Sequence, residues 1–168
     1  MSLINQARRF DVIHPSLSAS QRRSYQLEDP SILSAEAAVP LINGEWLEIA
    51  AGQKAKRGTG NASVASYPYF GSDPISAQTT GQVTLLDGPH RAKTAVFKSD
   101  ASYAVGTKLM VGSVTAFGLT RRALLPQTGD TKVVAVVEDI LDDPNFGNPD
   151  AGANKGKFLV IRFNPAGV

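Results

Sequence analysis

The fold of this chain is decided by two short runs, VVAVV at residues 133–137 and FLVI at residues 158–161. Each run is a continuous series of β-branched or other apolar side chains, which is typical of a strand buried on both faces of a sheet. Between them lies DDPNFGNPDAGANKG at residues 142–156, a stretch rich in Gly and Asn where no regular structure is expected. We therefore place the centre of the hydrophobic core on these two strands.

Further strands are expected on the N-terminal side of this pair. Glycine, proline and aspartate separate a series of short β-branched and apolar segments, and segments bounded in this way predict strands. With the two central strands included, they are residues 63–70, 82–86, 92–98, 108–114, 119–124, 132–140 and 157–163. Strands that follow one another without intervening helices indicate an all-β fold, as a sandwich or a small β-barrel.

Two local signals precede these strands. Asp29-Pro30 predicts the start of one short helix, which ends before Pro40. The dipeptide Asn43-Gly44 accepts the positive φ angles of a tight turn, so it predicts a hairpin between residues 41–42 and residues 45–50.

The composition describes one folded domain. A chain of 168 residues can bury roughly 70% of its unfolded surface, and its 42% hydrophobic content is too high for a disordered chain. No apolar run approaches the ~20 residues that cross a bilayer, and residues 1–10 lack a signal-peptide core, so neither membrane insertion nor secretion is expected. The absence of cysteine excludes disulfides and Cys-based zinc sites, and two histidines are too few for a three-histidine metal site.

Residues 1–28 are expected to form an extended arm, with the β-barrel-like body at residues 29–168. The segment shows no sustained strand or helix period, and residues 1–27 hold four arginines against one acid. Its apolar side chains are too many for an inert linker, so we expect another molecule to shelter them. A protein partner with carboxylates fits this mixture better than nucleic acid does. The expected partner-binding residues are Leu3, Ile4, Arg8, Arg9, Phe10, Val12, Ile13, Arg22, Arg23 and Tyr25.

No pattern predicts an active site. The chain has no Gly-x-Ser-x-Gly motif, and we interpret His90 as a solvated turn residue and His14 as a contact residue of the arm rather than as catalytic bases. Glu45 and Glu48 flank Trp46 three residues apart on a predicted strand, so they point to opposite faces and cannot form the acid pair of a glycosidase. We expect Trp46 to pack in the core, and we expect neither an enzyme nor a cofactor.

The acidic loop at residues 142–156 has one feature of a calcium loop, the alternation of Asp143 and Asn145. Gly147 follows too soon for the EF-hand pattern, and position 154 is Asn rather than the bidentate Glu. A solvated loop is therefore the preferred interpretation, with a weak calcium site as the alternative. The glycine spacings of the chain fit no phosphate-binding loop.

One further pattern extends over residues 39–168. It consists of PLINGEWLE at 40–48, QVTLLDG at 82–88, AKT at 92–94, YAVGTKL at 103–109, GLT at 118–120, TGD at 128–130, VVAVVE at 133–138 and FLVIRF at 158–163. In this order of signals the chain resembles the decoration (cement) or head-stabilising proteins of tailed bacteriophages.

The resemblance implies a structural virion protein that is made in the host cytoplasm and placed on the capsid exterior. The resemblance implies a body that is a small β-barrel or β-tulip. This body would bind the outside of the major capsid protein lattice, bridge adjacent subunits and associate with other copies of itself as a dimer or trimer. Direct nucleic-acid binding, membrane binding, metals and cofactors are not expected in this role. The alternatives are another phage β-barrel, such as a tail-tube or baseplate component, and a saccharide-acting hydrolase.

Overall fold

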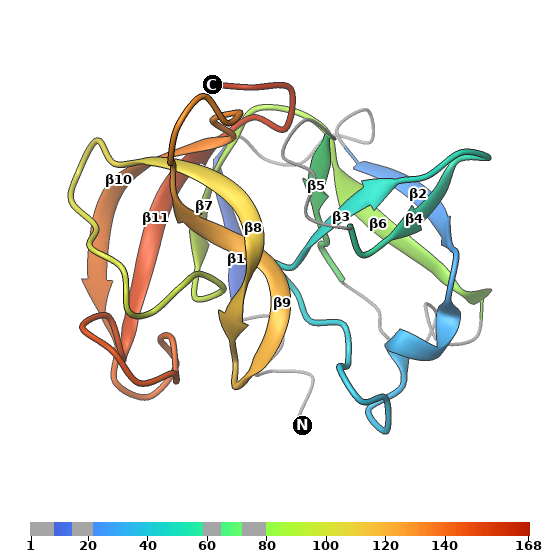
Figure 1. Cartoon of the computed structure of the whole chain (residues 1–168), viewed down its shortest axis with the longest axis horizontal. Helices are drawn as coiled ribbons and strands as arrows, with labels where there is room; N and C mark the ends of the chain where they lie inside the picture. Colours follow the sequence, from blue (N-terminus) through green and yellow to red (C-terminus); the bar gives the residue numbers. More distant parts are fainter. Residues whose placement is uncertain (1–8, 15–21, 59–64, 72–79) are drawn as a thin grey trace.

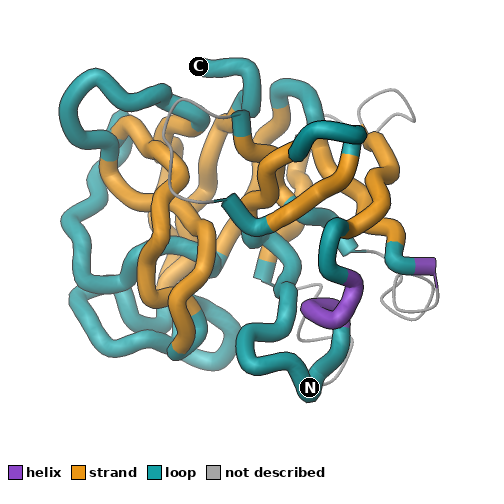
Figure 2. The backbone as a smooth tube through the Cα atoms, turned by 45° about the vertical axis from the view of Figure 1, so that its right-hand side comes forward, coloured by secondary structure: helices purple, strands orange, loops and turns teal. Residues whose placement is uncertain are grey.

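Strands make up nearly all of the regular structure in the computed structural model, which describes residues 9–14, 22–58, 65–71 and 80–168. They form two curled sheets that lie side by side (Figure 1) and are seen from a second direction in Figure 2. The predicted all-β fold is confirmed.

The larger sheet has six strands in the order β1-β7-β11-β10-β8-β9, each antiparallel to its neighbours. Their bounds are β1 Phe10–His14, β7 His90–Thr94, β8 Lys108–Ala116, β9 Leu119–Pro126, β10 Ala135–Asp142 and β11 Lys157–Phe163. The two runs that decide the fold pair directly, with Val137 opposite Ile161. Residues 158–161 are buried throughout, as predicted, whereas β10 becomes exposed toward its C-terminal end.

The smaller sheet has five strands in the order β5-β3-β4-β2-β6. Their bounds are β2 Arg22–Leu27, β3 Trp46–Ile49, β4 Lys54–Lys56, β5 Ser66–Pro68 and β6 Gln82–Leu86. A bridge between Tyr69 and Leu85 connects the two edges of this sheet, and a bridge between Phe97 and Leu124 connects the chain after β7 to β9. Both sheets therefore curl toward closure.

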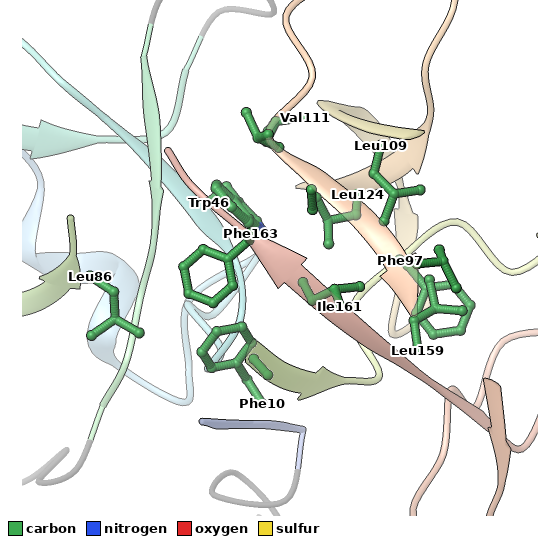
Figure 3. Packing of buried hydrophobic residues seen from close by; sticks show 14 residues of the cluster. Phe10, Trp46, Leu86, Phe97, Leu109, Val111, Leu124, Leu159, Ile161 and Phe163 are labelled. Atoms are coloured by element: carbon green, nitrogen blue, oxygen red, sulfur yellow. The ribbon is translucent and has the colours of Figure 1, made fainter. Parts of the chain in front are cut away.

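One hydrophobic cluster is shared by the two sheets. Trp46 of β3 and Leu86 of β6 belong to the same cluster as the inward-facing residues of β7 to β11. The Trp46 ring meets Phe163 edge-on at 5.9 Å between centroids, and Figure 3 shows both rings beside Phe10. The prediction that Trp46 packs in the core is confirmed. A second hydrophobic cluster, which includes Leu47 and Leu85, is formed by buried residues of the smaller sheet and of the segments next to it.

The expected extended arm is wrong for the described part of residues 1–28. Phe10–His14 is β1, paired with β7, and Arg22–Leu27 is β2, paired with β6 and β4. Each strand pairs with residues at least about thirty positions away, and each is too short for its alternation to stand out in the sequence. Residues 1–8 and 15–21 lie outside the described residues.

The two local signals have different outcomes. Pro30–Leu33 is a single 3₁₀ turn, and the Asp29 side chain caps it by accepting a hydrogen bond from the Ser31 N–H, so the predicted short helix is confirmed. The predicted hairpin is wrong, because β3 pairs with β5 and β4 and not with residues 41–42. Gly44 does adopt a positive φ of 86°, but its turn leads into β3 from a loop.

Candidate functional site

Buried charges lie where the two sheets meet. Glu45 precedes β3 and its side chain is fully buried; Arg57 follows β4, and Arg121 belongs to β9. The Arg57 Nε donates to Glu45 Oε1 at 2.5 Å, and Arg121 Nη1 donates to Glu45 Oε2 at 3.4 Å. A single carboxylate therefore connects an arginine of the smaller sheet to an arginine of the larger sheet.

The same arginines hold the loop that enters β3. Arg57 Nη1 donates to the Val39 carbonyl at 2.6 Å, and Arg121 donates to the carbonyls of Pro40 and Ala116. Burial lowers the pKa of Arg121, and the Glu45 carboxylate opposes that shift. Because its donors meet protein acceptors, we interpret this cluster as a structural clamp between the sheets.

A second buried ion pair, between Glu48 and Arg122, has a longer contact distance and fewer hydrogen bonds than the cluster around Glu45. Glu48 and Arg122 are almost fully buried, and Arg122 Nη2 lies 3.7 Å from Glu48 Oε1. Among the described residues, no hydrogen-bond partner is found for Glu48 Oε1, for Arg122 Nε and Nη1, or for the Trp46 indole N–H. Gly58 packs directly on Glu48, since a Cβ there would lie 1.9 Å from Glu48 Oε1. Glu45 and Glu48 thus bind different arginines, and they do not act as a pair.

Most of the described residues of the expected arm pack within their own chain. Phe10 is 1% exposed in the shared core, and Val12 packs against that core. Tyr25 packs against the cluster of the smaller sheet. Arg9 is buried with its guanidinium 4.4 Å from the Phe117 ring centroid, and burial, together with the charge of Arg121, lowers its pKa to about 10.

Arg9 and Phe10 are thus buried within the chain, and Val12 and Tyr25 are partly buried, so these four side chains already pack against their own fold. Their role in binding a partner stays a prediction. Arg23 forms an ion pair with Asp87 at 2.5 Å. Ile13 remains 49% exposed on the outer side of β1. The side chain of Arg22 is not described, and Leu3, Ile4 and Arg8 lie outside the described residues.

The interpretation of His90 as a solvated turn residue is also wrong. Its ring is buried and stacks on Phe163 at 5.3 Å between centroids, and its Nδ1 lies 2.8 Å from the Gly88 carbonyl oxygen. The register explains this burial, because His90 begins β7 directly opposite Phe163 of β11. His14 ends β1, and its side chain is not described.

Residues 142–156 are irregular, as expected, but they are anchored rather than simply solvated. Asn148 donates to the Phe97 carbonyl, and Asn154 donates to the carbonyls of Ser99 and Ala101. Asp143 Oδ1 accepts from the N–H groups of the two residues at positions 145 and 146. Within the part of the chain that is described, no three His, Cys, Asp or Glu side chains gather as metal ligands would.

Asp150 is a structural residue that the sequence analysis missed. Its two carboxylate oxygens accept hydrogen bonds of 2.7 Å from the backbone N–H groups of Phe117 and Gly118, at the turn between β8 and β9. Both turn residues have positive φ angles of 54° and 75°. The abundance of Asn and Asp in this loop is the only sequence signal for such side-chain-to-backbone bonding.

The end of β10 and the loop after it contain exposed side chains of both kinds. Leu141 and Phe146 are each 39% exposed, and Asp139 and Asp142 are also exposed. The other large apolar side chains that are exposed among the described residues are Ile13, Val105, Leu119 and Val168.

Comparison of the chain with protein-family models, with curated proteins and with solved structures found no match. The resemblance to decoration proteins therefore stays a prediction. In the segments that the structure describes, no helix has the length and apolar character needed to span a membrane.

Proposed function

We propose that this chain is a structural protein of a tailed-bacteriophage virion, one that decorates the outside of the capsid and stabilises the head by bridging adjacent major capsid subunits. In this proposal the chain binds and does not catalyse. It acts on the capsid exterior together with other copies of itself, as a dimer or trimer.

One observation carries the proposal: the segments that resemble decoration proteins fold together as one all-β body. They supply β3 of the smaller sheet, β6 and β7, and the turns and strands from β8 to β11. The two sheets share a core, and the clamp around Glu45 connects them. A rigid body of this kind suits a protein that bridges subunits, because little ordering entropy is lost when it binds.

Attachment in this proposal uses the surface of the body. Phe10 and Val12 already pack within the chain, so they supply no strap for another molecule. Leu3, Ile4 and Arg8 remain predicted contacts. Deleting residues 1–28 would remove β1 and β2, whereas deleting residues 1–8 removes no described strand and therefore isolates the role of these three residues.

The test is co-sedimentation of the purified chain with emptied shells assembled from the major capsid protein of the virus that encodes it. We expect saturable binding and a higher temperature of shell disruption, and prior saturation with unlabelled chain serves as the control. Failure to bind such shells would refute the proposal. Rings or tubes formed by the purified chain alone would favour a tail-tube component instead.

A further inference from the structure

A buried polar layer lies between β3 and β9, where the smaller sheet meets the larger one. Trp46 and Glu48 are two residues apart on β3, so their side chains share one face of the strand. That face is turned toward β9, because Glu48 forms its ion pair with Arg122 and Trp46 belongs to one cluster with Leu124. Figure 3 shows Trp46 and Leu124 in this cluster. We call Trp46, Glu48 and Arg122 the β3–β9 polar layer.

The hydrogen-bonding groups of this layer are buried and incompletely matched. The side chains of Glu48 and Arg122 are only 3% and 4% exposed. Among the described residues, no partner is found for three donor atoms, Arg122 Nε, Arg122 Nη1 and Trp46 Nε1, or for the acceptor Glu48 Oε1. A buried polar group without a partner costs about 1–3 kcal/mol, and a charged group costs more. The layer therefore has the donors and the acceptor to bind a small polar molecule.

The ion pair itself does not close this gap. Arg122 Nη2 and Glu48 Oε1 are 3.7 Å apart, which is too long for a hydrogen bond. Glu48 is packed against Gly58, where a Cβ would lie 1.9 Å from Oε1. Arg122 is carried by β9, which pairs with β8 along its whole length. The packing on both sides favours a bridge across the gap over a closer direct contact.

The charges of the pair select a neutral molecule that both donates and accepts. An anion at this place would be repelled by the Glu48 carboxylate, and a cation by the Arg122 guanidinium. In the part of the chain that is described, no three His, Cys, Asp or Glu side chains gather as metal ligands. A water molecule can accept from an N–H group and donate to a carboxylate oxygen. Buried waters in proteins typically make about three such bonds to groups that would otherwise have no partner.

We propose that a buried water molecule is bound between the two sheets, where it accepts a hydrogen bond from the Arg122 guanidinium and donates one to Glu48 Oε1. The clamp around Glu45 differs, because that carboxylate accepts hydrogen bonds directly from two arginines. The two sheets are thus connected by one direct polar contact and by one that is bridged by water. This inference goes beyond the proposed function and does not depend on it.

Nuclear Overhauser effects between water and the isotope-labelled wild-type chain test the inference. The reporter is the Arg122 Nε–H. The matched control is the Nε–H of Arg121, an arginine that is buried to the same extent but donates to the Ala116 carbonyl at 3.0 Å. We expect a cross-peak to water at Arg122, with the sign given by a long-lived bound molecule, and its loss at Arg121. No cross-peak at Arg122, or equal cross-peaks at the two arginines, would overturn the inference.

Two variants control for groups that exchange protons with solvent and imitate a bound water. Ser66 of β5 and Lys56 of β4 are directly opposite Glu48, one on each side. Ser66→Ala and Lys56→Met remove these exchangeable protons and leave the carboxylate and the guanidinium in place. We expect the Arg122 cross-peak to persist in both variants, and its loss in either one would count against a bound water.

A crystal structure of the wild-type chain supplies an independent measurement. We expect an ordered water within hydrogen-bond distance of both Glu48 Oε1 and the Arg122 guanidinium. A direct hydrogen bond between Arg122 and Glu48, with no water between them, would overturn the inference.

Discussion

Replacing Phe10 with alanine should destabilise the whole fold, because this residue near the N-terminus belongs to the core. Its ring lies 6.4 Å from the Phe70 ring and 6.0 Å from the Phe163 ring, measured between centroids, and it is 1% exposed. A buried Phe→Ala substitution costs about 3–5 kcal/mol. In a domain of this size that cost lowers Tm by roughly 6–20 °C.

Urea unfolding followed by circular dichroism measures this effect, and Ile13→Ala is the matched control. Ile13 is on the same strand but 49% exposed, so its truncation should change the free energy of unfolding by only about 0.5 kcal/mol. Both variants shorten one apolar side chain of β1 to alanine, and the main difference between the two sites is burial. If Phe10→Ala were as mild as Ile13→Ala, the assignment of β1 to the folded body would be refuted.

Three further predictions concern buried polar groups. Arg122→Leu leaves Glu48 buried without its partner and should lower the free energy of unfolding by about 3–5 kcal/mol in urea. Adding Glu48→Leu should recover most of that loss. A double variant as unstable as the single one would contradict this. Asp150→Ala removes the acceptor of two backbone N–H groups and should lower the free energy of unfolding by about 2–4 kcal/mol. The control Asp130→Ala, at an exposed residue, should lower it by only about 0.5 kcal/mol. Equal losses would show that the turn between β8 and β9 does not depend on Asp150. Burial raises the pKa of Tyr69 to about 12, whereas an unfolded tyrosine titrates near 10. Between pH 10 and pH 12 the unfolded state therefore binds fewer protons than the folded state, so the free energy of unfolding should fall as the pH rises. The fall should be steeper in wild type than in Tyr69→Phe. Parallel plots of unfolding free energy against pH for the two proteins would contradict this.

The strands with strong apolar runs could be predicted from sequence, because β-branched runs between turn residues specify strands locally. β2 and β4 could not, since RRSYQL and KAK contain few apolar residues and are strands only through their pairing with each other and with β6 and β3. The sequence correctly indicated that Phe10 and Val12 need shelter. It carries no signal for whether that shelter is in the same chain, and β7 provides it about eighty residues later.

The candidate site was less predictable. Arg121 and Arg122 form a charged pair in a strand, a pattern usually typical of a solvated surface, and their burial depends on Glu45 and Glu48 more than seventy residues away. The position of His90 directly after Gly88-Pro89 favours a solvated turn, yet the register of β7 on β11 places its ring over Phe163. The exposure of Leu141 and Phe146 could not be predicted either, because it depends on where β10 ends and on how the loop after it is anchored.

Electron cryomicroscopy of emptied shells saturated with the chain tests the central claim most directly. The account predicts added density on the outer face of the shell that the two-sheet body fits, bridging adjacent subunits of the major capsid protein. Shells without added density on their outer face would contradict it.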